Sequence, residues 1–210
     1  MISQVRKPVL PAPTKPALTL SLPSDQATTA LGIRLAQALH PGDTLLLEGP
    51  VGAGKSLLAR AIIQARQSAH GPIEDVPSPS FTLVQTYTAG PDTLIHADLY
   101  RLAGGADIVE LGLDEAAQTA ILLVEWPERW GPETPARHLK LHLSPDAQNE
   151  AFRHLTATPA GAGWDHIRPA LSPTPRQALR ESFLAGTPWR YSTVTPFPGD
   201  ASKRRYFRIG

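Results

Sequence analysis

A glycine-rich segment between an apolar run and a helical stretch constrains this sequence most. Residues 49–56 read Gly-Pro-Val-Gly-Ala-Gly-Lys-Ser and fit the pattern G-x-x-x-x-G-K-[ST]. The run Thr44-Leu-Leu-Leu-Glu48 before it is typical of a buried parallel strand. The apolar positions of residues 56–67 predict a helix after it. A strand, a glycine-rich turn and a helix in this order indicate a loop that binds phosphate.

The chemistry that this loop predicts is the binding of ATP with Mg²⁺. Glycines let the backbone turn its N–H groups towards phosphate oxygens, and the first turn of the helix adds a positive dipole. We expect the Lys55 ammonium to contact the β- and γ-phosphates and the Ser56 hydroxyl to bind Mg²⁺. The expected nucleotide contacts in the loop are Gly49, Val51, Gly52, Ala53, Gly54, Lys55, Ser56 and Leu57.

Two further apolar runs each end in an acid. They are Thr93-Leu-Ile-His-Ala-Asp98 and Ala120-Ile-Leu-Leu-Val-Glu125. A phosphate site of this kind needs a carboxylate at the end of a neighbouring strand to hold the coordination shell of the Mg²⁺ ion. We expect both Asp98 and Glu125 to lie in the site, although a strand-end acid can also simply face solvent. His96 shares a strand face with Asp98, and a core or hydrogen-bonding role is the expectation for it.

Strands interleaved with helices predict an α/β fold. Residues 18–22 alternate like a half-buried strand, and Ser24 or Asp25 can cap a helix over residues 26–39. A short helix is expected over 108–118, and residues 137–143 and 152–157 suggest a terminal antiparallel pair. The prediction is a P-loop NTPase-like three-layer sandwich, with a mostly parallel central sheet and antiparallel C-terminal strands.

Composition limits the partners and the compartment. The net charge of +1 gives no electrostatic argument for direct binding to nucleic acid or to a membrane. The chain has no cysteine and no run of about 20 apolar residues, so thiolate metal sites and a membrane span are not predicted. We expect a cytoplasmic protein with three parts: a Pro-rich tail over 1–17, an ATPase domain over 18–168, and a separate segment over 169–210.

Four further strings accompany residues 49–56. They are Ser78-Pro-Ser-Phe-Thr-Leu-Val84, His96-Ala-Asp-Leu-Tyr-Arg-Leu102, Glu110-Leu-Gly-Leu113 and Glu125-Trp-Pro-Glu128. Taken together, the five strings resemble the TsaE family, whose members are the ATPase subunit of the machinery that makes threonylcarbamoyladenosine in tRNA. The strings also follow one another in the order and at the spacing of the family, across roughly residues 18–168.

The resemblance implies a compact α/β ATPase that acts in a complex with TsaB-like and TsaD-like proteins and reaches tRNA only through them. It places Ser56 and Glu125 on the Mg²⁺-binding positions and Asp98 on a position tied to hydrolysis. It also places Ser80 to Thr82 on a switch-like loop that senses the γ-phosphate, and Ser24 near the nucleotide. The sequence departs from the family at Ser56 and Ser80, where Thr is common, and at Ser24, where Asp is frequent.

The roles of three side chains beside these strings stay open. Trp126 and Tyr100 follow the two acids and fit either the core or an interface, and for Trp126 packing near the nucleotide is favoured. Arg101 fits a catalytic cation and an ordinary salt bridge equally well.

The segment over 169–210 is expected to be separate from the ATPase domain. After a Pro-rich stretch, residues 176–184 look helical, and residues 198–208 resemble the opening hairpin of aminoglycoside-phosphotransferase-like kinases. The alternative is a basic tail that touches RNA, carried by Lys203, Arg204, Arg205 and Arg208. In either case we expect removal of the segment to leave the ATPase domain nearly intact.

The function that these observations predict is slow ATP hydrolysis in support of tRNA threonylcarbamoylation. Two alternatives stay open from the sequence. A P-loop also serves small-molecule kinases, which need an acceptor pocket and an arginine-bearing lid. A non-enzymatic adaptor that nucleotide only stabilises is the other alternative.

Overall fold

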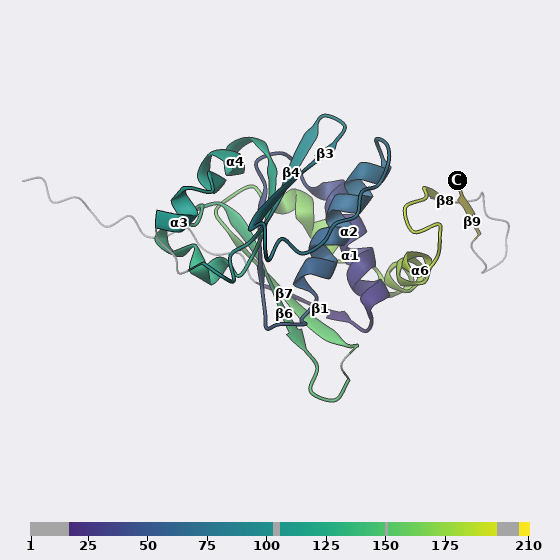
Figure 1. Cartoon of the computed structure of the whole chain (residues 1–210). Coiled ribbons are helices and arrows are strands. Elements are labelled where there is room, and N and C mark those ends of the chain that lie inside the picture. Colours follow the sequence, from purple (N-terminus) through teal and green to yellow (C-terminus); the bar gives the residue numbers. More distant parts are fainter. Residues whose placement is uncertain (1–16, 103–105, 150, 197–205) are drawn as a thin grey trace, which may run out of the picture.

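The computed structural model describes residues 17–102, 106–149, 151–196 and 206–210. Seven strands form one sheet in the order β1-β7-β6-β2-β5-β4-β3 (Figure 1). The central strands β6, β2, β5 and β4 pair in parallel, whereas β1–β7, β7–β6 and β4–β3 are antiparallel. The strands are β1 Leu18–Leu22, β2 Thr44–Glu48, β3 Val84–Ala89, β4 Asp92–Asp98, β5 Ile121–Glu125, β6 His138–Pro145 and β7 Arg153–Ala160.

Helices cover both faces of the sheet, so the predicted three-layer α/β sandwich is confirmed (Figure 1). One face is covered by α1 (Asp25–Ala38), α2 (Lys55–Ser68), the 3-10 turn η3 (Asp165–Ile167) and α5 (Arg168–Leu171). The other is covered by α3 (Ala106–Val109) and α4 (Leu113–Thr119). Two further 3-10 turns, η1 (Pro127–Arg129) and η2 (Gly131–Glu133), follow β5.

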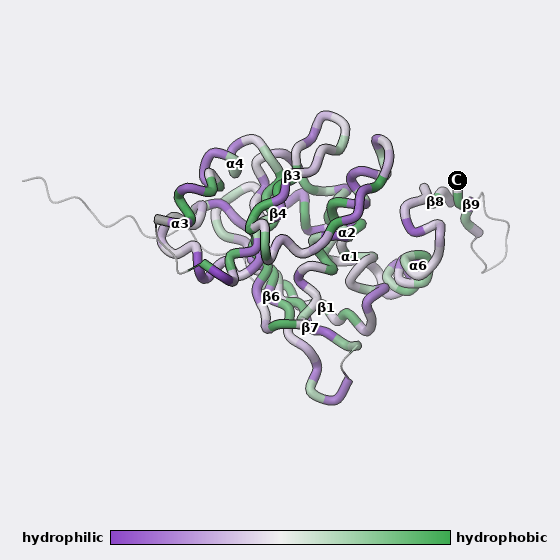
Figure 2. The backbone as a smooth tube through the Cα atoms, in the orientation of Figure 1, coloured by the Kyte–Doolittle hydropathy of each residue, from purple (hydrophilic) through white to green (hydrophobic). Residues whose placement is uncertain are grey.

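The core divides into two clusters because a strand sends alternate side chains to opposite faces. In β2, Leu45 and Leu47 lie in the cluster beneath α1 and α2, and Leu46 lies in the cluster beneath α3 and α4. The tube in Figure 2 shows this hydrophobic interior along the strands. Full burial of one leucine contributes about 1.5–3 kcal/mol, so burial on both faces explains why a run of three leucines forms a central strand.

Two elements differ from the sequence prediction. The single helix expected over 108–118 is interrupted, because Gly112 adopts φ 65° between α3 and α4. Strand β3 was not predicted at all. Among the described residues it is an edge strand that pairs with β4 alone, through a turn at Gly90. Its burial alternates only over its last four residues, and half of its six residues are Gln or Thr, so its sequence signal is weak. The Ser24 cap is confirmed, since its Oγ accepts a hydrogen bond from the Ala27 N–H at 3.2 Å.

The C-terminal segment is attached to the sandwich through α1. Helix α6 (Pro175–Ala185), which confirms the helix expected there, lies on the outer side of α1 (Figure 1). Ala170 and Leu171 belong to the core cluster beneath α1 and α2. Strands β8 (Val194–Pro196) and β9 (Phe207–Ile209) form a separate antiparallel pair. The division into three parts stays a prediction, and the expected tail and the basic residues 203–205 lie outside the described residues.

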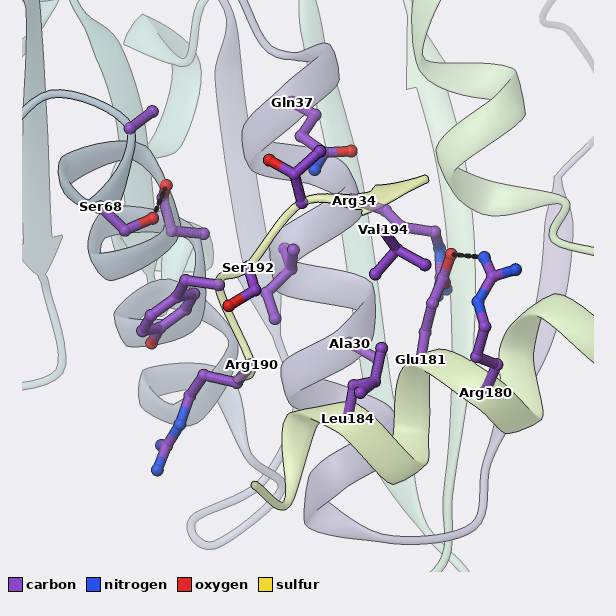
Figure 3. Close-up of a pocket in the computed structure, with 15 residues that line it drawn as sticks. Ala30, Arg34, Gln37, Ser68, Arg180, Glu181, Leu184, Arg190, Ser192 and Val194 are labelled. Carbon is purple, nitrogen blue, oxygen red and sulfur yellow. Dashed lines mark hydrogen bonds and ion pairs between the residues drawn. The ribbon is translucent and has the colours of Figure 1, made fainter. Parts of the chain in front are cut away.

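A pocket of about 650 Å³ lies where this segment meets the sandwich (Figure 3). It is lined by α1, α2, α6 and residues 190–194, and its charged lining includes Arg34, Arg180, Glu181 and Arg190. The pocket contains no residue of the segment 49–56, so it is separate from the predicted nucleotide site.

Candidate nucleotide-binding site

The predicted phosphate loop connects the end of β2 to the start of α2, as the sequence requires. Its three glycines all adopt positive φ: 136° at Gly49, 79° at Gly52 and 96° at Gly54. A Cβ at Gly49 would also lie 2.2 Å from the Leu143 carbonyl oxygen, which no side chain tolerates. The loop therefore depends on glycine for its backbone conformation and, at Gly49, for the close approach of β6.

Lys55 is the first residue of α2, and its side chain is folded into the loop. Its Nζ donates hydrogen bonds to the carbonyl oxygens of Gly49 at 2.8 Å and Pro50 at 2.9 Å. The same ammonium lies 4.0 Å from the centroid of the Trp126 ring. Burial lowers the pKa of Lys55 below its usual value of 10.5, and three carboxylates, chiefly those of Glu125 and Asp98, oppose this shift. The loop thus holds a cation opposite two acids.

Ser56, Glu125 and His96 form a buried chain of contacts. The Ser56 hydroxyl donates to Oε2 of Glu125 at 3.0 Å, and Oε1 of the same carboxylate lies 2.9 Å from Nε2 of His96. Glu125 is 2% exposed and His96 is fully buried. Among the described residues, Nδ1 of His96 has no hydrogen-bond partner. The expected hydrogen-bonding role of His96 is therefore observed, and its partner is the acid at the end of β5.

Asp98 lies beside Glu125, because the two residues are paired in register between β4 and β5. Its carboxylate holds the loop that precedes β3. Oδ2 accepts from Ser80 Oγ at 2.7 Å and Ser78 Oγ at 3.2 Å, and Oδ1 accepts from the Tyr100 N–H at 3.0 Å. Asp98 therefore couples the end of β4 to residues 78–80, which include the start of the predicted switch-like loop.

The structure brings most of the predicted residues together, with two exceptions. Thr82 is exposed, and among the described residues its side chain forms no hydrogen bond with the loop. The Ser24 hydroxyl accepts the hydrogen bond that caps α1, from the Ala27 N–H, and is therefore engaged outside the loop. Val51 lies at the open tip of the loop with 77% of its surface exposed, whereas Ala53 is buried. Lys55, Ser56, Glu125 and Asp98 form the centre of the site.

Sequence reasoning missed Arg153. This residue is at the start of β7 on the same face as Leu155, and it is 9% exposed. Its Nε donates to the Ala53 carbonyl oxygen at 3.0 Å, and Nη1 lies 2.8 Å from the carboxylate of Asp25 at the start of α1. The available signal was an arginine at an inward position of an otherwise apolar strand face. A buried guanidinium needs partners, and here one partner is the phosphate loop.

Aromatic side chains border the site. Trp126 follows Glu125 and adopts φ 58°. The centroid of its ring lies 4.8 Å from that of the Tyr100 ring, and the ring also contacts the Lys55 ammonium. Trp126 thus lies beside Lys55 of the loop, and its packing near the nucleotide stays a prediction. Phe81 is 82% exposed, and the Arg101 guanidinium lies 4.3 Å from the centroid of its ring.

Within the part of the chain that the structure describes, no helix has both the length and the apolar character that crossing a membrane requires.

Comparisons with known proteins show which family this chain resembles. Residues 22–154 match the family model described as threonylcarbamoyl adenosine biosynthesis protein TsaE. The chain is 43% identical over 108 residues to the tRNA threonylcarbamoyladenosine biosynthesis protein TsaE of Rickettsia conorii, a match that covers 51% of this chain and 60% of the relative. The chain thus spans less than two thirds of that relative's length. The protein of the same name from Streptomyces coelicolor is 36% identical over 140 residues, a match that covers 64% of this chain and 91% of that protein.

Among solved structures, the chain is similar to the crystal structure of YdiB from Bacillus subtilis. The TM-score is 0.61 at 27% sequence identity, and the match covers 75% of this chain and 95% of that one. The family model matches well over half of the chain, from the end of β1 into β7, and includes the whole loop with both acids. This chain belongs to the TsaE family.

Proposed function

We propose that this chain is a Mg²⁺-dependent, ATP-hydrolysing subunit that supports the threonylcarbamoylation of tRNA adenosine. The observation that carries the proposal is the hydrogen bond from Ser56 of the loop to Glu125 at the end of β5. It joins the hydroxyl and the carboxylate that a P-loop site needs on one metal ion, from residues 69 positions apart in the chain.

The donor set fits Mg²⁺. Ser56, Glu125 and Asp98 offer a hydroxyl and two carboxylates, and hard oxygen ligands with room for water are what this ion prefers. Ser56 and Glu125 would hold the ion, with Asp98 next to it. When bound, Mg²⁺ with ATP would neutralise charge that develops on the phosphate oxygens.

The remaining residues would bind and orient the nucleotide. The positive φ values of Gly52 and Gly54 favour a loop whose N–H groups face a phosphate, and α2 contributes its N-terminal dipole. Lys55 would exchange its two carbonyl partners for the β- and γ-phosphate oxygens, which are stronger acceptors because they are charged. His96 would hold the Glu125 carboxylate in place, and Asp98 would relay the state of the site to the loop at Ser78 and Ser80.

The partners that we propose are TsaB-like and TsaD-like proteins, with tRNA reached only through them. The relatives named above are tRNA threonylcarbamoyladenosine biosynthesis proteins, which supports the pathway. Exposed Phe81 and Val51 border the candidate site, and apolar side chains there would be covered by a partner that senses the nucleotide.

The test is an ATPase assay on the full chain and on Glu125→Gln, alone and with a purified TsaB–TsaD-type pair. The amide keeps the shape of the side chain and removes the charge that would anchor the metal shell, so we expect ATP binding to persist and Mg²⁺-dependent hydrolysis to fall by about 100-fold or more. Glu115→Gln is the matched control, because this exposed acid lies on α4, outside the contact chain.

The outcomes separate the alternatives. Hydrolysis in Glu125→Gln at the rate of the parent chain contradicts the assigned metal position. Co-purification with the pair that is independent of ATP supports an adaptor in place of an ATPase. Transfer of phosphate to a small molecule, with no free phosphate released, supports a kinase.

A further inference from the structure

A second cluster of metal-ligating side chains lies at the opposite end of β2. His40, Asp43 and His166 each offer one ligand atom, and these three atoms all lie within 4.8 Å of one another. Asp43 directly precedes β2, whereas the phosphate loop directly follows it. The five residues of β2, at about 3.3 Å each, place about 16 Å of strand between the two sites. The cluster is therefore not part of the nucleotide site.

The chain builds this cluster by first fixing Asp43. Residues 40–43 form a tight turn in which the Asp43 N–H donates to the His40 carbonyl oxygen at 3.0 Å, and Gly42 adopts φ 89°. Pro and Gly at the two central positions are the residues that such a turn requires. The His40 N–H in turn donates to Oδ2 of Asp43 at 2.8 Å. The carboxylate is 2% exposed and held in one orientation.

Arg137 fixes the other carboxylate oxygen and leaves Oδ2 for the cluster. Its Nη2 donates to Oδ1 of Asp43 at 2.6 Å, and its Nη1 donates to the Gly42 carbonyl oxygen at 3.1 Å. The guanidinium also lies 4.2 Å from the centroid of the Trp164 ring. Partners of this kind around a ligating carboxylate fix its orientation. The arginine thus acts on the opposite side of the carboxylate from the two histidines.

The histidines approach Oδ2 from two separate elements. Nε2 of His166, on η3, lies 3.0 Å from Oδ2 of Asp43. The centroids of the His40 and His166 rings are 4.8 Å apart. His166 is kept in position by its neighbour Ile167, which is fully buried, and by packing on Trp164. The side chain of His166 is 24% exposed and His40 is exposed, so the two histidines lie at the surface beside the buried Asp43 carboxylate.

We propose that His40, Asp43 and His166 bind a divalent transition-metal ion of the Zn²⁺ class. Two imidazole nitrogens and one carboxylate oxygen form a donor set that suits Zn²⁺, Co²⁺ or Ni²⁺ better than Mg²⁺ or Ca²⁺. Bonds of about 2.0–2.1 Å in a tetrahedron place ligand atoms about 3.4 Å apart, so no pair of these atoms has to approach by more than about 1.4 Å. His166 binds as the neutral imidazole whose proton is on Nδ1.

Three protein ligands leave at least one position on the ion for water. The ion ties the turn between α1 and β2 to η3, which are 123 positions apart at Asp43 and His166. Because such an ion binds the folded chain only, it stabilises the fold by RT ln(1 + L/Kd), where L is the concentration of free ion and Kd its dissociation constant. The proposal is independent of the proposed ATPase function, since none of its residues belongs to the nucleotide site.

The test is a titration of the untagged, chelator-treated full chain with Co²⁺, followed by its visible absorption, and with Zn²⁺, followed by calorimetry. We expect one equivalent to bind without nucleotide, and Zn²⁺ to raise the Tm. His40→Gln and His166→Gln should each weaken binding by at least about tenfold. Loss of a residue that only hydrogen-bonds a metal ligand already lowers metal affinity by about that factor, and loss of the ligand itself should cost at least as much. His40 is exposed, so its substitution leaves the fold intact, and circular dichroism checks both variants.

Two controls separate this site from other modes of binding. His154→Gln removes a histidine whose Nε2 lies 3.3 Å from the Asp146 carboxylate, with no third ligand among the described residues, and the variant should bind Co²⁺ like the parent chain. Glu125→Gln should also keep the Co²⁺ spectrum, which distinguishes this ion from one in the proposed Mg²⁺ site. No binding by the parent chain, or equal affinity in His40→Gln, His166→Gln and His154→Gln, overturns the proposal and leaves a purely structural hydrogen-bond network.

Discussion

At the scale of the residue, Lys55 connects the conformation of the loop to the chemistry proposed for it. Its ammonium bonds two loop carbonyl oxygens and faces two buried acids. Lys55→Ala should weaken ATP binding by about 2 kcal/mol or more, roughly 30-fold, because a charge-assisted hydrogen bond to phosphate is lost. Calorimetric titration with Mg·ATP measures this. Lys140→Ala, a surface lysine paired with Glu48, is the control, and unchanged affinity in Lys55→Ala would remove the P-loop assignment.

Arg153 shows how a single residue can position the loop from a distant strand. Arg153→Lys keeps the charge but loses the guanidinium group, whose separate nitrogens contact both Ala53 and Asp25. We expect the free energy of unfolding to fall by about 1.5–3 kcal/mol, since a buried hydrogen bond from a charged group is lost, and ATP to bind more weakly. Chemical denaturation with and without nucleotide measures both effects.

Asp25→Asn is the comparison for that variant. Asp25 is 63% exposed, so its ion pair should contribute little. If Asp25→Asn and Arg153→Lys lost equal stability, the hydrogen bond to Ala53 would not be the important contact.

At the scale of the element, the packing of α1 on α2 depends on Gly32. A Cβ there would lie 2.5 Å from the Cβ of Ala61 and 3.2 Å from two backbone atoms of α2, so the helices would have to separate. Overpacking costs about 1–3 kcal/mol, and higher helix propensity returns about 1 kcal/mol. Gly32→Ala should therefore lower the free energy of unfolding by up to about 2 kcal/mol.

The same variant tests how helix position affects the loop, because α2 begins at Lys55. Thermal melts and ATP titration of Gly32→Ala should show a loss in both properties. Gln37→Ala, at an exposed position of α1, changes propensity alone and should be neutral or slightly stabilising. A Gly32→Ala chain as stable as its parent would mean that the two helices have room to adjust.

At the scale of the whole molecule, the segment after β7 both completes the core and covers α1. Ala170 and Leu171 are buried in the main cluster, whereas α6 contributes Leu184 and Ala185, and its Glu181 bonds Arg34 at 2.7 Å. A chain that ends at residue 172 should stay folded with a Tm lower by about 4–12 °C, from a loss of about 2–3 kcal/mol.

A chain that ends at residue 168 should lose more, because it also removes two side chains of the core. Melts of both truncated chains with Mg·ATP present and absent would measure the difference. Equal melting of these two chains and the full chain would confirm the sequence expectation that residues 169–210 are separable. The packing of α6 on α1 would then add nothing measurable to stability.

The sequence by itself determined the features that depend on neighbours in the chain. The strand, glycine turn and helix around residues 44–67, the cap at Ser24 and the acids that end β4 and β5 are all local patterns, set by backbone conformation and by burial of a single run. They were sufficient for the α/β class and for the centre of the site. The break at Gly112 is local too, but a lone glycine within a helical pattern is a weak signal.

Only the tertiary structure decided which distant groups meet. The contact of Arg153 with Ala53 joins positions 100 residues apart, that of His96 with Glu125 joins positions 29 apart, and that of His166 with Asp43 joins positions 123 apart. The edge strand β3 and the docking of α6 also depend on partners elsewhere in the chain. No local pattern encodes these contacts, because a polar group buried by the fold takes whichever partner the sheet order brings within hydrogen-bond distance.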